Sequence, residues 1–357
     1  MSPLILTILL FGLGLGTTIT FASSHWLLAW MGLEINTLAI IPLMAQHHHP
    51  RAVEATTKYF LTQATAAAML LFASTTNAWL TGQWEIQQMY HPLSVTLATL
   101  ALALKIGLAP FHAWLPEVLQ GLSLTTGLIL STWQKLAPFI LLLQIQPTNP
   151  IMLVILGITS TLIGGWGGLN QTQLRKILAY SSIAHLGWMI LVLQLAPSLT
   201  LLTLLTYLIM TLSVFLIFKL NKTTTINMLA TSWTKTPTLT SMSPMILLSL
   251  GGLPPLTGFM PKWLILQELT KHDLALIATT AALTALLSLY FYLRLSYTIT
   301  LTISPSNLTG TLPWRLHPSQ LTLPLTFSTS ATILLLPLTP TILTTLTSLT
   351  SLTSLRC

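Results

Sequence analysis

Long apolar runs, separated by short polar segments, follow one another along almost the whole chain of 357 residues. Most are close to the roughly 20 residues that an α-helix needs to cross the hydrocarbon core of a bilayer. They are also continuous, whereas the strands of a membrane β-barrel would alternate over about ten residues. The pattern predicts an all-α polytopic membrane protein with about eleven transmembrane helices. Their approximate limits are 3–21, 25–45, 55–80, 93–120, 122–144, 150–170, 177–195, 199–220, 239–269, 274–299 and 323–346.

Two of these spans, the fourth and the ninth, carry helix-breaking residues at matching positions. Gly107 and Pro110 recur as Gly252 and Pro255 at a constant offset of 145 residues (252 − 107), and Pro254 adjoins the second proline. Proline removes a backbone donor and breaks a helix, so we predict helix breaks at Gly107, Pro110, Pro254 and Pro255. Paired Gly/Pro-interrupted segments in two halves of a chain are typical of transporters built from internal repeats.

The spacing of the breaks predicts how the chain is organised. We expect a first five-helix repeat in residues 1–145, a second in residues 146–302, and a connecting loop with a C-terminal transmembrane helix in residues 303–357. Because the ninth span comes five spans after the fourth, an odd step, the two broken spans cross the membrane in opposite directions and the repeats should have inverted topology. The expected architecture is therefore an antiporter-like fold of two inverted repeats, each with a broken helix.

Basic residues in the loops predict the orientation of the chain in the membrane. The positions on the N-terminal side are Arg51, Arg175, Lys176, Lys219, Lys222, Lys235, Arg294 and Arg315, against Lys271 and Arg356 on the other side. By the positive-inside rule, the N-terminus lies on the cytoplasm-equivalent side and the C-terminus on the opposite side.

Composition narrows the class of protein further. Only 6% of the residues are charged and 53% are hydrophobic, whereas soluble domains carry about 25% charged residues. The formal charge of +8 is scattered among apolar spans, so no nucleic-acid partner is expected. The single cysteine, Cys357, excludes intrachain disulfides and Cys-ligated clusters. The chain enters its first apolar run without a basic segment, so we expect no cleavable signal.

Four ionisable side chains lie in or beside the apolar spans: Glu34, Lys105, Lys135 and Lys262. A lysine at bilayer depth costs about 2.5–3.5 kcal/mol on insertion scales, and such residues usually mark functional sites. Each one alone could simply pair with a neighbour and hold helices together. As a set beside two broken helices, they favour a proton pathway, in which a lysine that moves relative to Glu34 changes its affinity for a proton.

Histidines are the second group of candidates. His112 lies beside the first break and His185 lies within a span, and imidazole titrates near neutrality. Both could relay protons, or both could pack as hydrogen-bonded side chains. The run of three histidines at 47–49 precedes Pro50 and cannot share one helix face, so we expect an interfacial loop and no metal site there. The amphipathic stretch 51–58 could face a partner or the lipid surface.

Several long motifs resemble one family over nearly the full length of the chain, as far as about residue 303. They lie at residues 24–37, 58–63, 107–117, 169–176, 181–189 and 252–263. These segments look like the chain 2 family of mitochondrial NADH–ubiquinone oxidoreductase, the antiporter-like subunits of respiratory complex I.

The resemblance implies a core membrane-arm subunit that takes part in proton translocation coupled to electron transfer from NADH to ubiquinone. It implies NADH:ubiquinone reductase (H⁺-translocating) activity of the whole complex, with no redox centre in this chain. NADH, FMN, iron–sulfur clusters and ubiquinone would be bound by other subunits. The partners would be other core and accessory subunits and membrane lipids. The location would be the inner mitochondrial membrane, with the N-terminus in the matrix and the C-terminus in the intermembrane space.

The family's proton-pathway residues match Glu34, Lys105, Lys135 and Lys262 here, and His112 and His185 match positions on its hydrophilic axis. Two alternatives remain open at this point. One is a stand-alone cation/proton antiporter of the same fold, and the other is a structural helix bundle without transport.

Overall fold

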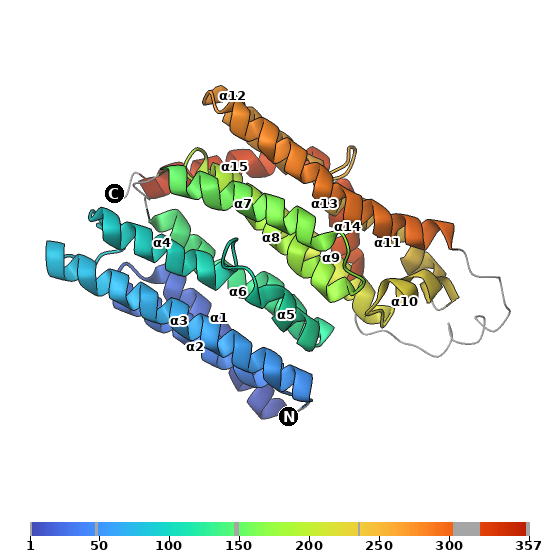
Figure 1. Cartoon of the computed structure of the whole chain (residues 1–357), viewed down its shortest axis with the longest axis horizontal. Helices are drawn as coiled ribbons and strands as arrows, with labels where there is room; N and C mark the ends of the chain where they lie inside the picture. The colour runs from blue at the N-terminus through green and yellow to red at the C-terminus, as the bar shows by residue number, and fades with distance from the viewer. Residues whose placement is uncertain (1, 47–48, 146–149, 235, 303–321, 355–357) are drawn as a thin grey trace. The chain divides into compact units, whose positions relative to one another are not determined.

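The computed structural model describes the chain except for residues 1, 47–48, 146–149, 235, 303–321 and 355–357 (Figure 1). Regular structure in the described part is helical, and its only strand-like pairs are the isolated bridges His25–Glu85 and Gln173–Thr225. The all-α fold predicted from the apolar pattern is thereby confirmed. The helices are α1 (Pro3–Ala22), α2 (Trp26–Met44), α3 (Pro50–Thr81), α4 (Pro92–Ile106), α5 (Trp114–Gly121), α6 (Leu124–Gln144), α7 (Pro150–Gly168), α8 (Leu174–Val192), α9 (Pro197–Leu220), α10 (Ile226–Ala230), α11 (Pro237–Gly251), α12 (Phe259–Lys271), α13 (Ala275–Leu301), α14 (Thr322–Leu334) and α15 (Thr339–Ser354).

The chain divides into two compact units, Met1–Leu156 and Gly157–Cys357, with the boundary inside α7. In the first unit, α1 packs along α2, α3 lies against α2, α4 and α5, and α6 contacts α1, α2 and α4. The contact between α1 and α2 depends on glycine, because a Cβ added at Gly16 would lie 2.8 Å from the Gly32 carbonyl oxygen. Small residues of this kind let membrane helices approach closely.

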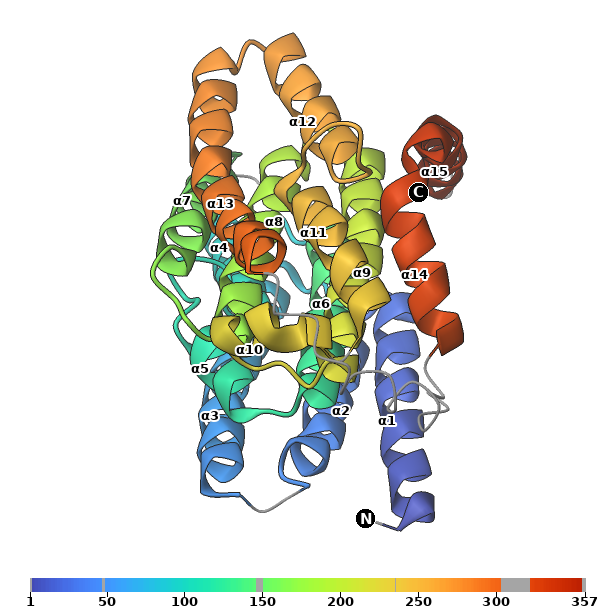
Figure 2. The same cartoon turned by 90° about the vertical axis from the view of Figure 1, so that its right-hand side faces the viewer.

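In the second unit, α9 is the helix around which several others gather. It contacts α8, α11, α12, α14 and α15, while α13 packs along α11 and α12 (Figure 2). The short helix α10 lies against α13 at the far end from the α12–α13 turn (Figure 2). The buried residues of α8 and α9 are mostly large apolar side chains, together with small hydroxyl residues that bond back to their own helices.

Both interrupted spans end their first helix in the same backbone geometry. Gly107 follows α4 with a φ of 86°, and Gly252 follows α11 with a φ of 80°. In each turn, two successive amides donate to one carbonyl: Gly107 and Leu108 to Ala103, and Gly252 and Leu253 to Leu248. Glycine reaches this left-handed conformation without steric cost. A cis X–Pro bond follows in each turn, at Ala109–Pro110 and at Pro254–Pro255.

Six described helices are long and apolar enough to cross a membrane, or seven if the bent pair formed by α14 and α15 counts as one span. The number of eleven therefore stays a prediction. The two broken spans miss this criterion because each is divided into short helices. Helix α8 is also outside the six, and it carries two basic residues, Arg175 and Lys176, in its first turn. The span expected at 323–346 is not one straight helix, since it bends by 71° at residue 335. Pro337 and Pro340 lie at this bend, where proline removes the donors that a continuous helix needs.

Candidate functional site

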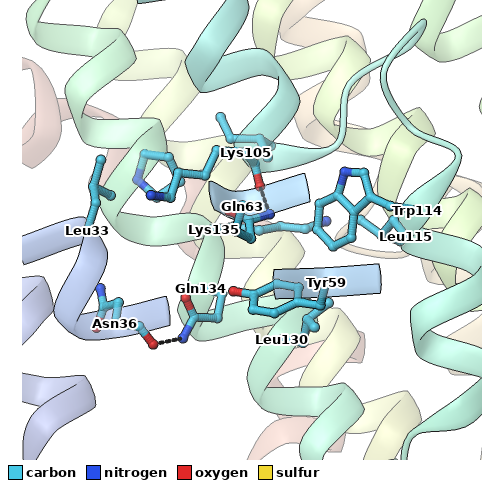
Figure 3. A pocket seen from close by; sticks show the side chains of 12 residues that line it. Leu33, Asn36, Tyr59, Gln63, Lys105, Trp114, Leu115, Leu130, Gln134 and Lys135 are labelled. Atoms are coloured by element: carbon cyan, nitrogen blue, oxygen red, sulfur yellow. Dashed lines mark hydrogen bonds between the residues drawn. The ribbon is translucent and has the colours of Figure 1, made fainter. Parts of the chain in front are cut away.

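A small cavity lies beside the first helix break, between α2, α3, α4, α5 and α6 (Figure 3). Its volume is about 10 Å³, close to the minimum that one water molecule requires. Two lysines and several amide side chains give it a partly polar lining. The lining residues are Leu33, Asn36, Tyr59, Gln63, Lys105, Ile106, Trp114, Leu115, Leu130, Gln134, Lys135 and Pro138.

Lys105 lies in the last turn of α4, one residue before the end of the helix. Its side chain is only 8% exposed, and its Nζ is buried without a hydrogen-bond partner among the described residues. A buried amine in that condition carries a large desolvation cost whenever it is protonated. A water molecule or a negative charge that comes close to Nζ would therefore favour the protonated form of Lys105.

The helix break exposes backbone carbonyls, and side chains from other helices satisfy two of them. Gln63 of α3 donates its side-chain amide to the Lys105 carbonyl at 3.3 Å, and Trp114 of α5 donates its indole N–H to the Leu104 carbonyl at 3.2 Å. Non-helical backbone at membrane depth is tolerated only where such partners or water replace the lost hydrogen bonds. These two contacts hold the end of α4, and with it Lys105, at the cavity.

Lys135 enters the same cavity from α6 and is 3% exposed. Its neighbour Gln134 donates to the backbone carbonyl of Asn36 at 3.3 Å, which joins α6 to α2 across the cavity (Figure 3). The structure therefore brings Lys105 and Lys135, both candidates from the sequence, to one site.

Glu34 is half-buried on α2, two residues from Asn36. Lys105 and Tyr59 both lie within electrostatic range of its carboxylate. The described ion pairs, defined by an N···O distance up to 4.0 Å, do not include a Glu34–Lys105 pair. Glu34 thus influences Lys105 through space without a direct salt bridge.

Lys262 marks a second cavity, of about 20 Å³, in the second unit. Its Nζ donates to the Gly251 carbonyl at 2.7 Å, so this lysine satisfies the carbonyl that ends α11. His185 of α8 lines the same cavity, and its ring lies 5.6 Å from the ring of Tyr207. The structure therefore places Lys262 and His185 together.

The remaining histidine candidates lie elsewhere. His112 lies in the first break, partly exposed, with its Nδ1 3.2 Å from the Pro110 carbonyl oxygen, and it does not line the cavity of Lys105. His49 caps the start of α3 by accepting from the Arg51 amide, whereas His47 and His48 lie outside the described residues. The described part of the chain contains no group of three or more metal-ligating side chains.

The sequence did not identify the amide side chains and the tryptophan that line the cavity with the two lysines. Each of these residues is polar or amphipathic and lies within an apolar span: Asn36, Gln63, Trp114 and Gln134. A polar residue in an apolar span was the feature of the sequence that could have identified them. The stretch 51–58 also has a contact that the sequence did not suggest, because Lys58 contacts Glu54 at 2.7 Å and Glu117 at 2.8 Å. Lys58 thereby ties the start of α3 to α5, the helix after the break.

A polytopic helical fold with two broken helices and a lysine at each break defines an antiporter-like membrane protein. Residues 23–288 match the family described as NADH:quinone oxidoreductase/Mrp antiporter, and residues 289–343 match the NADH dehydrogenase subunit 2 C-terminus. The chain belongs to the NADH-ubiquinone oxidoreductase chain 2 family.

Individual relatives agree with this assignment. The chain is 80% identical to NADH-ubiquinone oxidoreductase chain 2 of Tetraodon nigroviridis, across 96% of this chain and 99% of that one. It is 72% identical to the chain 2 protein of Oncorhynchus mykiss, across 96% and 98%. A chain of respiratory complex I from Thermus thermophilus superposes with a TM-score of 0.83 at 30% identity, covering 94% of this chain and 78% of that chain.

Proposed function

We propose that this chain is a membrane-arm subunit of respiratory complex I in the inner mitochondrial membrane. In this role it takes part in proton translocation coupled to electron transfer from NADH to ubiquinone. Its family and its resemblance to a complex I chain support the assignment. Other subunits of the complex are its partners, and they bind the redox cofactors. Lipids surround it, with the N-terminus in the matrix and the C-terminus in the intermembrane space.

The observation that carries the proposal is the buried, unpartnered Nζ of Lys105 at a cavity shared with Lys135. Two amines in a small polar cavity of low dielectric cannot both be protonated without strong repulsion. A single proton shared between them passes to one or the other as the local field changes. Lys105 is the central carrier in this scheme, Lys135 exchanges with it, and Glu34 supplies the charge that biases the exchange.

The second unit also has a cavity with two groups that can exchange protons, but here they are a lysine and a histidine. Lys262 is held at the end of α11, and His185 in the same cavity offers an imidazole that can accept or donate a proton. Both belong to the proposed proton pathway. His112 belongs to it as a group near the first break, from which it can exchange protons with water.

The energy for this switching comes from outside the chain. Moving one charge across 100 mV is worth about 2.3 kcal/mol, and NADH oxidation in the rest of the complex supplies it. The chain thus contributes groups that load and release protons, and its neighbours impose the change of field or position that drives them.

The test is Lys105→Met in the assembled complex, reconstituted into sealed vesicles. Methionine keeps an unbranched side chain of similar length and removes the titratable group. We expect NADH-driven acidification to fall to a small fraction of the wild-type rate while complex assembly is retained. The matched control is Lys271→Met, which removes an exposed lysine of α12 that pairs with Glu268 at 2.7 Å. Normal acidification in the assembled Lys105→Met complex would overturn the proposal.

A further inference from the structure

Asn36 lies at the cavity of Lys105 with an amide group that forms no hydrogen bond. The residue is 2% exposed, and both Oδ1 and Nδ2 are buried without partners among the described residues. Its backbone carbonyl accepts a hydrogen bond from the Gln134 side chain (Figure 3). Buried polar side chains in folded proteins nearly always have a partner, either in the protein or in an ordered water molecule.

Close packing restricts where the Asn36 side chain can go. A Cβ added at Gly16 of α1 would lie 2.7 Å from Asn36 Oδ1, so the amide already lies against the backbone of that helix. The amide is therefore held in place by its surroundings, although no hydrogen bond holds it. Asn36 is also one of the residues that line the cavity.

The cavity has the size and the polar atoms that one water molecule needs. Its volume of about 10 Å³ is near the lower limit for a single water and too small for a chain of several. A buried water typically makes two to four hydrogen bonds. Two groups in the lining have no hydrogen-bond partner among the described residues, the amide of Asn36 and the Nζ of Lys105. A water molecule could form a hydrogen bond with each.

We propose that Asn36 and Lys105 together bind one water molecule, and that Asn36 is a positioning residue for proton transfer at Lys105. This inference rests on the proposed function of Lys105 as a proton carrier. The amide does not ionise. It holds the water oxygen so that the lone pair faces the Lys105 ammonium.

The transfer is balanced in protons and needs no other reactant. The water accepts a proton as one N–H bond of the Lys105 ammonium breaks, and it releases a different proton through its other hydrogen bond. The neutral amine of Lys135, which lines the same cavity, accepts that proton. The water is unchanged, Lys105 becomes neutral and Lys135 becomes an ammonium.

The experiment compares Asn36→Leu with Asn36→Ser in the assembled complex in vesicles. Leucine keeps the branched shape at Cγ, fills the space and offers no hydrogen bond. Serine leaves room for water and retains a hydroxyl that can bind it. Because positioned proton-transfer groups contribute about 100-fold or more, we expect at least a ~10-fold loss of NADH-driven proton translocation in Asn36→Leu and a smaller loss in Asn36→Ser.

A role in packing alone predicts the reverse order, because serine leaves the larger void at a buried site. Asn77→Leu is the control for losing a buried amide: Asn77 is 0% exposed on α3 in the same unit, and it does not line the cavity. We expect that variant to retain translocation per assembled complex. Wild-type translocation in Asn36→Leu, with Lys105→Met still inactive, would overturn this inference and leave the proposed function standing.

A second measurement does not depend on any variant. A map of the wild-type complex at a resolution that shows ordered waters should contain one within hydrogen-bonding distance of both the Asn36 amide and Lys105 Nζ. Density for water in the neighbouring cavities and none at this position would also overturn the inference.

Discussion

The side-chain amide of Gln63 donates a hydrogen bond to the backbone carbonyl of Lys105 at 3.3 Å. Gln63 comes from α3 and is 3% exposed, and Lys105 is in the last turn of the broken helix α4. The contact joins the continuous helix α3 to the C-terminal end of α4. It therefore fixes the backbone from which the proposed proton carrier extends.

Replacing Gln63 with leucine tests this contact. The Lys105 carbonyl would lose a buried donor, and an unsatisfied buried group costs about 1–3 kcal/mol. We expect a lower melting temperature of the membrane arm and slower proton translocation, because the end of α4 is less well held. Calorimetry and acidification assays on one preparation measure both effects. Thr65→Val, at an exposed position of the same helix, should leave both unchanged, and a wild-type result for Gln63→Leu would show that the contact is dispensable.

Gly252→Ala tests the geometry of the second break. A side chain at a φ of 80° costs about 1–2 kcal/mol in backbone strain. The new Cβ would also lie 2.8 Å from Lys262 Cδ, so the lysine must shift. We expect loss of stability together with reduced proton translocation.

Gly82→Ala provides the matched control for that variant. Gly82 ends α3 with a φ of 74°, but a Cβ there would meet nothing within 4 Å. The Gly82→Ala variant should therefore lose stability through backbone strain alone, and its proton translocation per assembled complex should be close to wild type. Equal losses of translocation in the two variants would mean that the position of Lys262 does not matter.

The helix breaks were accessible to sequence reasoning because their causes are local. Gly107 and Gly252 adopt a backbone conformation that other residues avoid, and proline removes a donor wherever it stands. Likewise, a lysine in an apolar run is conspicuous in any sequence. The all-α fold, the two interruptions and the candidate lysines therefore followed from composition and spacing.

The residues that surround these lysines could not be derived in the same way. Gln63 and Asn36 line the cavity of Lys105 only after α2, α3 and α4 have packed, and nothing in their spacing along the chain specifies that arrangement. The C-terminal region shows a second limit, since residues 323–346 are apolar throughout but bend by 71° in the structure. Hydropathy reports that a segment is apolar and does not report how its prolines divide it.

The central claim is that Lys105 gives up and regains a proton, and Lys105→Arg tests it most directly. Arginine keeps the positive charge but is not deprotonated in proteins, so it separates a fixed charge from a proton carrier. The measurement is the number of protons translocated per NADH oxidised by the assembled variant complex in sealed vesicles. We predict a clear fall below the wild-type ratio, as far as in Lys105→Met. A wild-type ratio in Lys105→Arg would contradict the account, because the residue would then act through its charge alone.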